Sequence, residues 1–322
     1  MNLMGNRAHH TILSAMPDAL GARDAIAPGI IVDFPEDAPP LHGRPSLARY
    51  RALARYMLNF DLVLSYNWGA MDGVMARRIY GRRGRHNMPR LIHHEDGFNE
   101  DESVRRDWRR NLFRRVALRT VEAVVVPSAL LQRIASAEWG IGSRVHLIRN
   151  GIEVTAYPSE VKRAIPGLQR RQGEVVIGTV AGLRKVKDLP RLVRAVASLP
   201  SNVRLVIVGE GPERETIAAQ AAACGIADRV VMPGFLVDPA GWIGHFDCLA
   251  LSSLSEQAPL AVIEAMAAGL PVVSPAVGDV AAMVSDANRP FIAEDEAGFR
   301  AALAQMVSDP ALRAAVGSAN RC

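Results

Sequence analysis

Two glutamates eight positions apart, Glu256 and Glu264, are the residues whose type and spacing most directly suggest chemistry. Glu256 follows the strand-like run DCLALSS, whereas Glu264 lies inside an apolar helix that Pro259 opens. A carboxylate in a buried helix is costly unless a partner compensates it. The sequence leaves two partners open, a pair of ligand hydroxyl groups or an arginine from elsewhere in the chain. Free amides at the start of this helix add a site for an anion or a hydroxyl group.

The second half of the chain supplies the elements that would position these glutamates. Apolar, β-branched runs predict strands, and the segments between them show helical periodicity. Strands separated by helices of this length predict a parallel sheet covered on both faces, that is, a Rossmann-like domain. The predicted strands are residues 175–182, 203–209, 229–235, 247–253 and 270–275, and the predicted helices are residues 188–199, 212–224, 238–246 and 259–268.

The first half repeats this alternation and predicts a second doubly wound α/β domain. Its predicted strands are residues 10–15, 29–34, 61–67, 89–95, 123–128 and 144–150, and its predicted helices are residues 46–58, 70–80, 102–121 and 128–138. We expect a first domain over 1–152, a polar, Pro- and Gly-containing linker over 153–173 and a second domain over 174–322. Ligands of open α/β sheets bind at the carboxyl ends of the strands, so a cleft between the domains is the expected site.

Composition excludes several classes of protein. The chain has 322 residues, of which 49% are hydrophobic and 22% charged, as in ordinary globular proteins. Its 5% of aromatic residues argues against a base-stacking surface for nucleic acid. Three cysteines without a CxxC pair support neither a disulfide framework nor a zinc site, which favours a reducing, cytoplasmic compartment. No apolar run reaches the roughly 18 residues of a membrane-spanning helix.

Positive charge is concentrated in the first half of the chain. Residues 1–150 contain 22 Arg, no Lys and 15 acidic residues, a net charge of +7, whereas residues 151–322 carry −2. Twelve of these arginines fall within 77–115. Such a cluster could attract an anionic membrane surface, with Arg105, Arg106, Arg109 and Arg110 on one side of a helix beside Trp108 and Phe113. The alternative is a solvated helix face with both aromatic residues in the core.

The stretch 252–284, SSLSEQAPLAVIEAMAAGLPVVSPAVGDVAAMV, closely resembles the E-x7-E signature of glycosyltransferase family 4. Further landmarks stand in the family's order: NGI at 150–152, VAGLRKVKDL at 180–189, VIVGEGPERE at 206–215 and VVMPGF at 230–235. The resemblance covers nearly the whole chain and implies the GT-B fold, two Rossmann-like doubly wound domains facing across a cleft. It also implies truncation at both ends, because the family's first strand, glycine-rich loop and helix have no counterpart and the chain stops in a helix that usually continues.

The resemblance implies a site for the donor, a nucleotide-diphosphate sugar, in the second domain. Glu264 corresponds to the residue that binds both ribose hydroxyls, and Glu256 to the residue that contacts the sugar. Lys187 corresponds to the diphosphate-binding lysine. The family often has an arginine where this chain has Gly182, and we assign Arg184 the missing charge. The remaining donor-binding predictions are Ala258, Pro259, Leu260, Gly209 and Phe235.

In the first domain, the resemblance implies a histidine facing the donor sugar. His94 of LIHHEDG (91–97) is the first choice and His93 the second, because adjacent residues on a strand point to opposite faces. A purely structural histidine is the alternative. Asn67 and Trp68, at the end of the preceding strand, are predicted to line the acceptor side together with His93.

The implied activity is a retaining, hexosyltransferase-type glycosyl transfer from a nucleotide sugar to a glycan or lipid-linked acceptor. Lys187, Arg184 and a helix start would stabilise the leaving diphosphate, so no metal and no other cofactor are expected. We expect a cytoplasmic protein, peripheral at the inner face of the membrane, that binds no nucleic acid. Two alternatives remain: a nucleotide-sugar epimerase on the same two-domain plan, and an inactive nucleotide-binding fragment.

Overall fold

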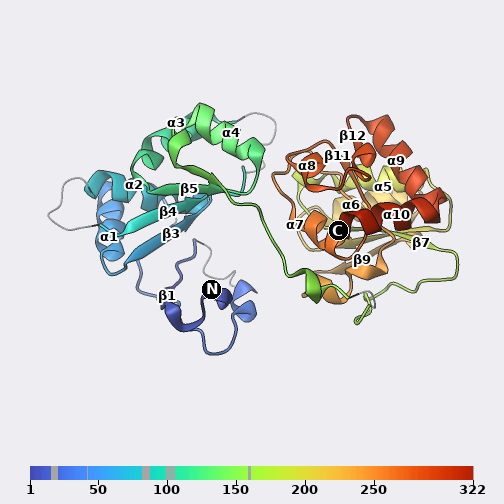
Figure 1. Cartoon of the computed structure of the whole chain (residues 1–322), viewed down its shortest axis with the longest axis horizontal. Helices are drawn as coiled ribbons and strands as arrows, with labels where there is room; N and C mark the ends of the chain where they lie inside the picture. Colours follow the sequence, from blue (N-terminus) through green and yellow to red (C-terminus); the bar gives the residue numbers. More distant parts are fainter. Residues whose placement is uncertain are drawn as a thin grey trace. The chain divides into compact units, whose positions relative to one another are not determined.

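The structure is a computed structural model, and its chain divides into two compact units (Figure 1). Unit 1 comprises Met1–Gly97, Arg106–Val126 and Leu131–Ile148, and unit 2 consists chiefly of the residues from Arg149 onward. The structure describes residues 1–15, 21–41, 43–81, 88–98, 102, 106–158 and 161–321. Of the predicted arginine cluster, residues 82–87 and Arg105 lie outside the described residues.

Unit 2 is built on one six-stranded parallel sheet, which contains every strand predicted for this half of the chain. The strand order is β12-β11-β10-β7-β8-β9 (Figure 1). The strands are β7 (Val175–Val180), β8 (Val203–Val208), β9 (Val230–Gly234), β10 (Cys248–Ala250), β11 (Val272–Pro275) and β12 (Ile292–Ala293). The helices are α5 (Leu189–Ala197), α6 (Arg214–Ala223), α7 (Leu260–Ala267), α8 (Val280–Met283), α9 (Glu296–Ser308) and α10 (Pro310–Arg321).

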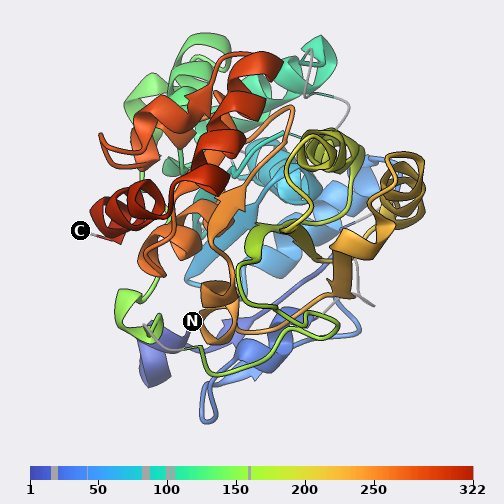
Figure 2. The ribbon, with the colours of Figure 1, turned by 90° about the vertical axis from the view of Figure 1, so that its right-hand side faces the viewer.

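Both faces of this sheet are buried, as a near-continuous apolar strand sequence predicts. On β8, Leu205 and Ile207 join a cluster that includes Phe299 of α9. Val206 points to the opposite face and joins a second cluster with Val262 of α7. Figure 2 shows the helices of unit 2 arranged around its strands. The two clusters hold the sheet rigidly, so the loops at its strand ends have a fixed base.

Unit 1 contains a four-stranded parallel sheet in the order β3-β4-β5-β6 (Figure 1). The strands are β3 (Leu62–Tyr66), β4 (Arg90–His94), β5 (Ala123–Val126) and β6 (Val145–Leu147). The helices are α1 (Leu47–Met57), α2 (Met71–Tyr80), α3 (Trp108–Ala117) and α4 (Ala129–Glu138). On the edge strand β3, Leu62, Leu64 and Tyr66 are 47%, 45% and 51% exposed, so alternate residues of this strand face solvent. The short strands β1 (His10–Thr11) and β2 (Val32–Asp33) pair separately.

Two predicted helices are wrong in extent. The helix expected over 102–121 begins only at Trp108, because the Asp107 carboxylate accepts the amides of Arg109 and Arg110 and so caps the helix there. In place of a helix over 238–246 there are two 3₁₀ turns, Pro239–Gly241 and Ile243–His245. Trp242, between the two turns, has a φ of −137°, which interrupts a continuous α-helix.

The segment expected as a linker, 153–173, packs on unit 2 in part. Tyr157 and Ile165 are 6% and 2% exposed and belong to the apolar cluster around α7. The signal for a linker was its content of proline, glycine and charged residues, which does not reveal two buried anchors. The domain boundaries at 152 and 174 stay a prediction.

We predict that Gly178→Ala destabilises unit 2. A Cβ on this β7 residue would lie 2.1–2.2 Å from the buried ring of Phe246, so the core must shift. We expect a loss of about 1–3 kcal/mol in the free energy of unfolding, measured by urea denaturation. As a control, Gly73→Ala in α2 meets no atom within 4 Å and should be stabilising by up to about 1 kcal/mol. Equal stability of the two variants would contradict this packing.

Candidate functional site

An ion pair between Lys187 and Glu256 joins two loops at the carboxyl ends of the unit 2 strands. The distance from Lys187 Nζ to Glu256 Oε1 is 2.5 Å, and the side chains are only 17% and 10% exposed. The same carboxylate oxygen accepts the hydroxyl of Ser253 at 2.7 Å. Lys187 follows β7 and Glu256 follows β10, and these strands are neighbours in the sheet. The structure thus brings together two residues 69 positions apart that sequence analysis placed in one site.

Backbone contacts hold this pair in place. The hydroxyl of Ser252 donates to the Lys187 carbonyl at 2.8 Å, and the Leu254 amide donates to the Val186 carbonyl at 2.8 Å. Asp188 then caps α5, its carboxylate accepting the Arg191 amide. The loop after β10 is therefore joined to the loop after β7 by hydrogen bonds to the backbone as well as by the ion pair.

Glu264 lies on α7, half-buried. Burial raises the pKa of its carboxyl, because desolvation disfavours the charged form. Within the residues that the structure describes, no arginine or lysine pairs with this carboxylate, so the arginine partner considered from the sequence is not found. Burial, and next the negative charge of Glu264, raise the pKa of the Tyr157 hydroxyl to about 12. The carboxylate is thus held in a desolvated place without a compensating cation.

The loop after β7 presents Arg184 where a family arginine was expected. Arg184 is exposed, and its Nε lies 3.6 Å from the position that a Cβ on Gly182 would take. A Cβ on Gly209 would lie 1.9 Å from the Ala181 carbonyl oxygen, and Gly209 has a φ of 137°. Glycine at 209 is therefore required for this close approach of the loops after β7 and β8.

The loop leading into α7 is held from two sides. The Asn150 side chain donates to the Ala258 carbonyl at 3.0 Å, and the Asp279 amide donates to the Gln257 carbonyl at 2.9 Å. Pro259 is the N-cap of α7, which begins at the 51% exposed Leu260. Phe235, directly after β9, is 71% exposed and so available to a ligand.

In unit 1, the two neighbouring histidines have different surroundings. His93 is fully buried, its Nδ1 2.9 Å from the hydroxyl of Ser65 and its Nε2 3.6 Å from Glu95 Oε2. This corrects the expectation that His93 lines the acceptor side, because a buried strand residue offers no surface to an acceptor. His94 is half-buried and stacks on Tyr66 with ring centroids 4.7 Å apart. Desolvation lowers the pKa of His94, against the opposing charge of Asp96.

Asn67 and Trp68 follow β3 and differ in their surroundings. Asn67 is exposed, with a φ of 56°. Trp68 is half-buried, 5.6 Å from the ring of Phe113, and the guanidinium groups of Arg110 and Arg114 lie over its ring at 5.4 and 5.0 Å. Trp68 is therefore largely engaged inside unit 1.

Sequence analysis missed several residues that shape these sites. Ser253 and Tyr157 carried no distinctive signal, since their roles depend on neighbours distant in the chain. Asn150 stood in a recognised landmark, NGI, and could have been proposed from it. Asp96 stood next to the predicted histidine within LIHHEDG, where an exposed acidic residue after a strand is a usable signal.

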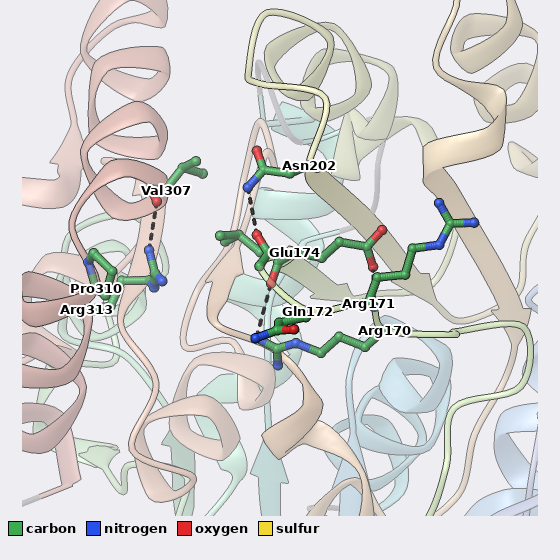
Figure 3. A pocket seen from close by; sticks show the side chains of 10 residues that line it. Arg170, Arg171, Gln172, Glu174, Asn202, Val307, Pro310 and Arg313 are labelled. Atoms are coloured by element: carbon green, nitrogen blue, oxygen red, sulfur yellow. Dashed lines mark hydrogen bonds between the residues drawn. The ribbon is translucent and has the colours of Figure 1, made fainter.

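A pocket of roughly 630 Å³ lies elsewhere in unit 2, at the amino ends of β7 and β8 (Figure 3). Two of the arginines that line it are engaged: Arg170 binds the Asp247 carboxylate at 2.7 and 2.8 Å, and Arg313 donates to the Val307 carbonyl at 2.9 Å. Parallel sheets bind ligands at the opposite edge, so this pocket is not the candidate site. The described part of the chain contains no group of three His, Cys, Asp or Glu residues placed to hold a metal ion. A search of the same residues found no helix long and apolar enough to cross a bilayer.

Comparison with known families tests the resemblance found in the sequence. The profile for "Glycosyl transferases group 1" matches residues 161–321, and the profile for "Glycosyltransferase Family 4" matches residues 4–156. The chain belongs to the glycosyl transferases of group 1. The resemblance drawn from the E-x7-E segment is thereby confirmed, and the matched group 1 region contains Lys187, Glu256 and Glu264.

Curated relatives of this group 1 chain match over about half of it. A 2-deoxystreptamine glucosyltransferase of Streptomyces kanamyceticus is 32% identical over 51% of this chain and 45% of its own length. A D-inositol 3-phosphate glycosyltransferase of Mycobacterium marinum is 32% identical over 45% of this chain and 32% of its own length. The chain thus spans less than half the length of these relatives.

Solved structures confirm the GT-B fold predicted for the group 1 chain. The structure of Anabaena Alr3699/HepE in complex with UDP and glucose has a TM-score of 0.74 at 19% identity, covering 91% of this chain and 81% of that one. The structure of WaaG, a glycosyltransferase involved in lipopolysaccharide biosynthesis, has a TM-score of 0.64 at 19% identity, covering 98% and 93%.

We predict that Gly278→Ala displaces the loop that carries Glu256. A Cβ on Gly278, whose φ is 56°, would lie 2.5 and 2.6 Å from the carbonyl oxygens of Glu256 and Gln257. A displacement of this size should weaken binding of UDP, the probe nucleotide, about 10- to 100-fold in titration calorimetry.

Gly225→Ala is the matched control for this substitution. Gly225 has a similar φ of 68°, and its Cβ would meet nothing within 4 Å. Both variants carry the strain of a positive φ, and only Gly278→Ala, which adds the contact with the loop, should lose nucleotide affinity. Equal affinities would show that the loop tolerates the shift.

Proposed function

We propose that the chain is a glycosyltransferase that moves a sugar from a nucleotide-diphosphate sugar to a hydroxyl acceptor with retention of configuration. The observation that carries this proposal is the Lys187–Glu256 ion pair at the carboxyl edge of one sheet, followed along the chain by the uncompensated Glu264 on α7. Family membership supports the reaction class, and the relatives reported above bear glycosyltransferase names. None of them is named as an epimerase, so the epimerase alternative has no support there.

Glu264 is the proposed ribose-binding residue. An ionised carboxylate accepts two hydroxyl donors at once, which a vicinal diol supplies. The diol would restore hydrogen bonds that burial has removed from this carboxylate. Phe235, exposed at the end of β9, is proposed to contact the base, and the backbone of Ala258 to Leu260 to approach the sugar and the diphosphate.

Lys187 and Arg184 are the proposed diphosphate ligands. In the structure Lys187 pairs with Glu256, so the diphosphate would share or take over this ammonium group, leaving Glu256 to accept a sugar hydroxyl. Arg184 lies over Gly182, where it restores the cation that the family often places there. Two cations and the first amides of α7 stabilise the negative charge of the leaving group, which supports a reaction without a metal ion.

The proposed reaction needs no protein nucleophile. The bond between the anomeric carbon and the leaving phosphate oxygen breaks, and the acceptor oxygen attacks from the same face. The acceptor proton passes to the leaving phosphate. His94 is proposed to contact the donor sugar, and its lowered pKa favours a neutral imidazole that can accept a sugar hydroxyl.

The basic side of α3 is proposed to bind an anionic membrane surface, where a lipid-linked or glycan acceptor would be presented. The exposed residues on this side differ from those expected from the sequence. Arg106 binds the Glu138 carboxylate, and Arg110 and Phe113 contact Trp68. The exposed side is formed instead by Trp108 (68% exposed) and Leu112 (52%) together with Arg109, Arg115 and Arg119. An exposed aromatic residue among cations suits an interface.

Glu264→Ala should weaken nucleotide binding far more than it destabilises unit 2. Loss of a charged acceptor to two hydroxyls is expected to cost about 2–4 kcal/mol, roughly a 30- to 700-fold rise in the Kd for UDP. Titration calorimetry measures the affinity and thermal unfolding checks the fold. An unchanged Kd would refute the ribose assignment.

The raised pKa of Glu264 also predicts that removing its charge stabilises the fold, although the same change weakens nucleotide binding. Its neutral form is favoured in the folded state, so this residue is least destabilising at acidic pH and most destabilising once pH rises above the folded pKa. Glu264→Gln should therefore raise the Tm at pH 7, with the gain disappearing near pH 4, while UDP binding weakens. Wild-type affinity should fall as pH drops through the raised pKa. A lower Tm of the Gln variant at pH 7 would contradict desolvation of this carboxylate.

Turnover of UDP-glucose should survive EDTA, because the diphosphate charge is met by Lys187 and Arg184. Lys187→Ala should lower the rate by about 10²-fold or more. Lys185→Ala, a change of the same charge at an exposed neighbouring position, is the control. Activity lost in EDTA and restored by magnesium or manganese would reject the metal-free assignment. Binding of UDP without any turnover would support the inactive nucleotide-binding alternative.

Sedimentation with vesicles tests the membrane surface. Binding should rise with anionic lipid and fall with salt, and Trp108→Ala with Arg109→Glu and Arg115→Glu should abolish it, at about 1 kcal/mol per cation. Arg133→Glu on α4 repeats the charge change at another exposed position of unit 1. Equal sedimentation with neutral and anionic vesicles would favour an acceptor in solution.

A further inference from the structure

Two stacked aromatic rings lie at the carboxyl ends of two neighbouring strands of the unit 1 sheet. Tyr66 and His94 are register partners on the neighbouring strands β3 and β4, with ring centroids 4.7 Å apart and an interplanar angle of 23°. Tyr66 is 51% exposed. Both residues stand at the carboxyl ends of their strands, the edge at which parallel sheets bind ligands. Neither aromatic ring of this pair is needed to fill the core of unit 1.

A side-chain clamp beside this stack fixes an exposed carboxylate. The Asn67 side chain binds residue 96 twice: its Oδ1 accepts the Asp96 amide at 2.7 Å, and its Nδ2 donates to Asp96 Oδ2 at 3.2 Å. The backbone amide of Asn67 donates to the His94 carbonyl at 2.8 Å. These three bonds hold Asn67 at a φ of 56°, a conformation that costs free energy in a non-glycine residue. The other carboxylate oxygen of Asp96, Oδ1, has no hydrogen-bond partner among the described residues.

We propose that Tyr66 and Asp96 form the acceptor subsite, and that it binds the ring of an uncharged sugar. The apolar C–H face of a sugar ring packs on an exposed aromatic ring, and its hydroxyls are donors that an oriented carboxylate accepts. Asn67 is a positioning residue that aims Asp96. This inference rests on the proposed function, because it names the class of acceptor for that reaction. The subsite includes the ring that stacks on His94, the residue proposed to contact the donor sugar.

The charge of Asp96 selects the class of acceptor. An exposed carboxylate next to the ring repels a phosphate or carboxylate group carried by the ring itself. Trp68 is not part of this subsite, because its ring is covered by Phe113, Arg110 and Arg114. The acceptor residues inferred from the sequence thus change from Asn67, Trp68 and His93 to Tyr66, Asn67 and Asp96.

Saturation-transfer difference NMR with methyl α-D-glucopyranoside tests the subsite on the full chain. We expect Tyr66→Ala to raise the Kd about 2- to 12-fold and Asp96→Asn about tenfold, whereas Tyr66→Phe keeps the ring and the binding. Trp108→Ala removes another exposed aromatic residue of unit 1, and Asp61→Asn removes an exposed carboxylate at the amino end of β3. Both controls should bind like wild type.

The donor site is separated by repeating the titration in Glu256→Ala, which should retain the signal that Tyr66→Ala loses. Hydrolysis of UDP-glucose, measured in parallel, should be unchanged in the control variant Asp61→Asn. Its absence in the wild type would count against the proposed function alone, because the NMR titration needs no turnover. Three results would overturn the subsite: no signal in wild type, equal Kd values in Tyr66→Ala and wild type, or equal losses in the two controls.

Discussion

The contact between the Lys187 ammonium and the Glu256 carboxylate is the interaction on which the candidate donor site depends. It closes the loops after β7 and β10 onto one another at 2.5 Å, where both side chains are mostly shielded from water. Breaking such a pair by removing one partner leaves a poorly solvated charge. A diphosphate that approaches Lys187 brings its own negative charge, so the ammonium group keeps an anionic partner throughout binding. The site is therefore organised before the ligand arrives, at the expense of a charge contact that the ligand must share.

Glu264 presents the opposite electrostatic situation. Its carboxylate is desolvated and no cation compensates it within the described residues, so unit 2 holds a destabilising group in an otherwise apolar helix. Functional groups of this kind persist because the bound ligand supplies the hydrogen bonds that the folded protein does not provide. Burial, and next the charge of the same carboxylate, raise the pKa of Tyr157, in the segment before β7.

Most of the fold could be predicted from the sequence, because apolar periodicity and strand-length runs reflect local physics. Strands β7 to β11 of unit 2 and helices such as α1, α2 and α4 were predicted within a few residues of their bounds, whereas the two-residue strand β12 was not predicted. Errors arose where a single side chain decides the boundary, as Asp107 does for α3, or where one residue leaves the helical backbone conformation within a predicted helix, as Trp242 does. The placement of Glu256 and Lys187 in one site followed from family resemblance, whereas their ion pair, the burial of His93 and the hydrogen bonds of Asn67 to Asp96 depend on tertiary neighbours that no local pattern records.

The outward side of β3 has a consequence for how this protein behaves at high concentration. A strand at the margin of a sheet offers unpaired amides and carbonyls, and here Leu62 and Leu64 add an apolar surface beside them. Natural proteins usually protect such margins with lysine, proline or a bulge, because otherwise they template pairing between chains. This strand, LVLSY, has none of these protections. The outer edge of β3 therefore favours pairing between chains, which the net charge of +5 opposes, and Leu62→Lys is the smallest change that would protect this edge.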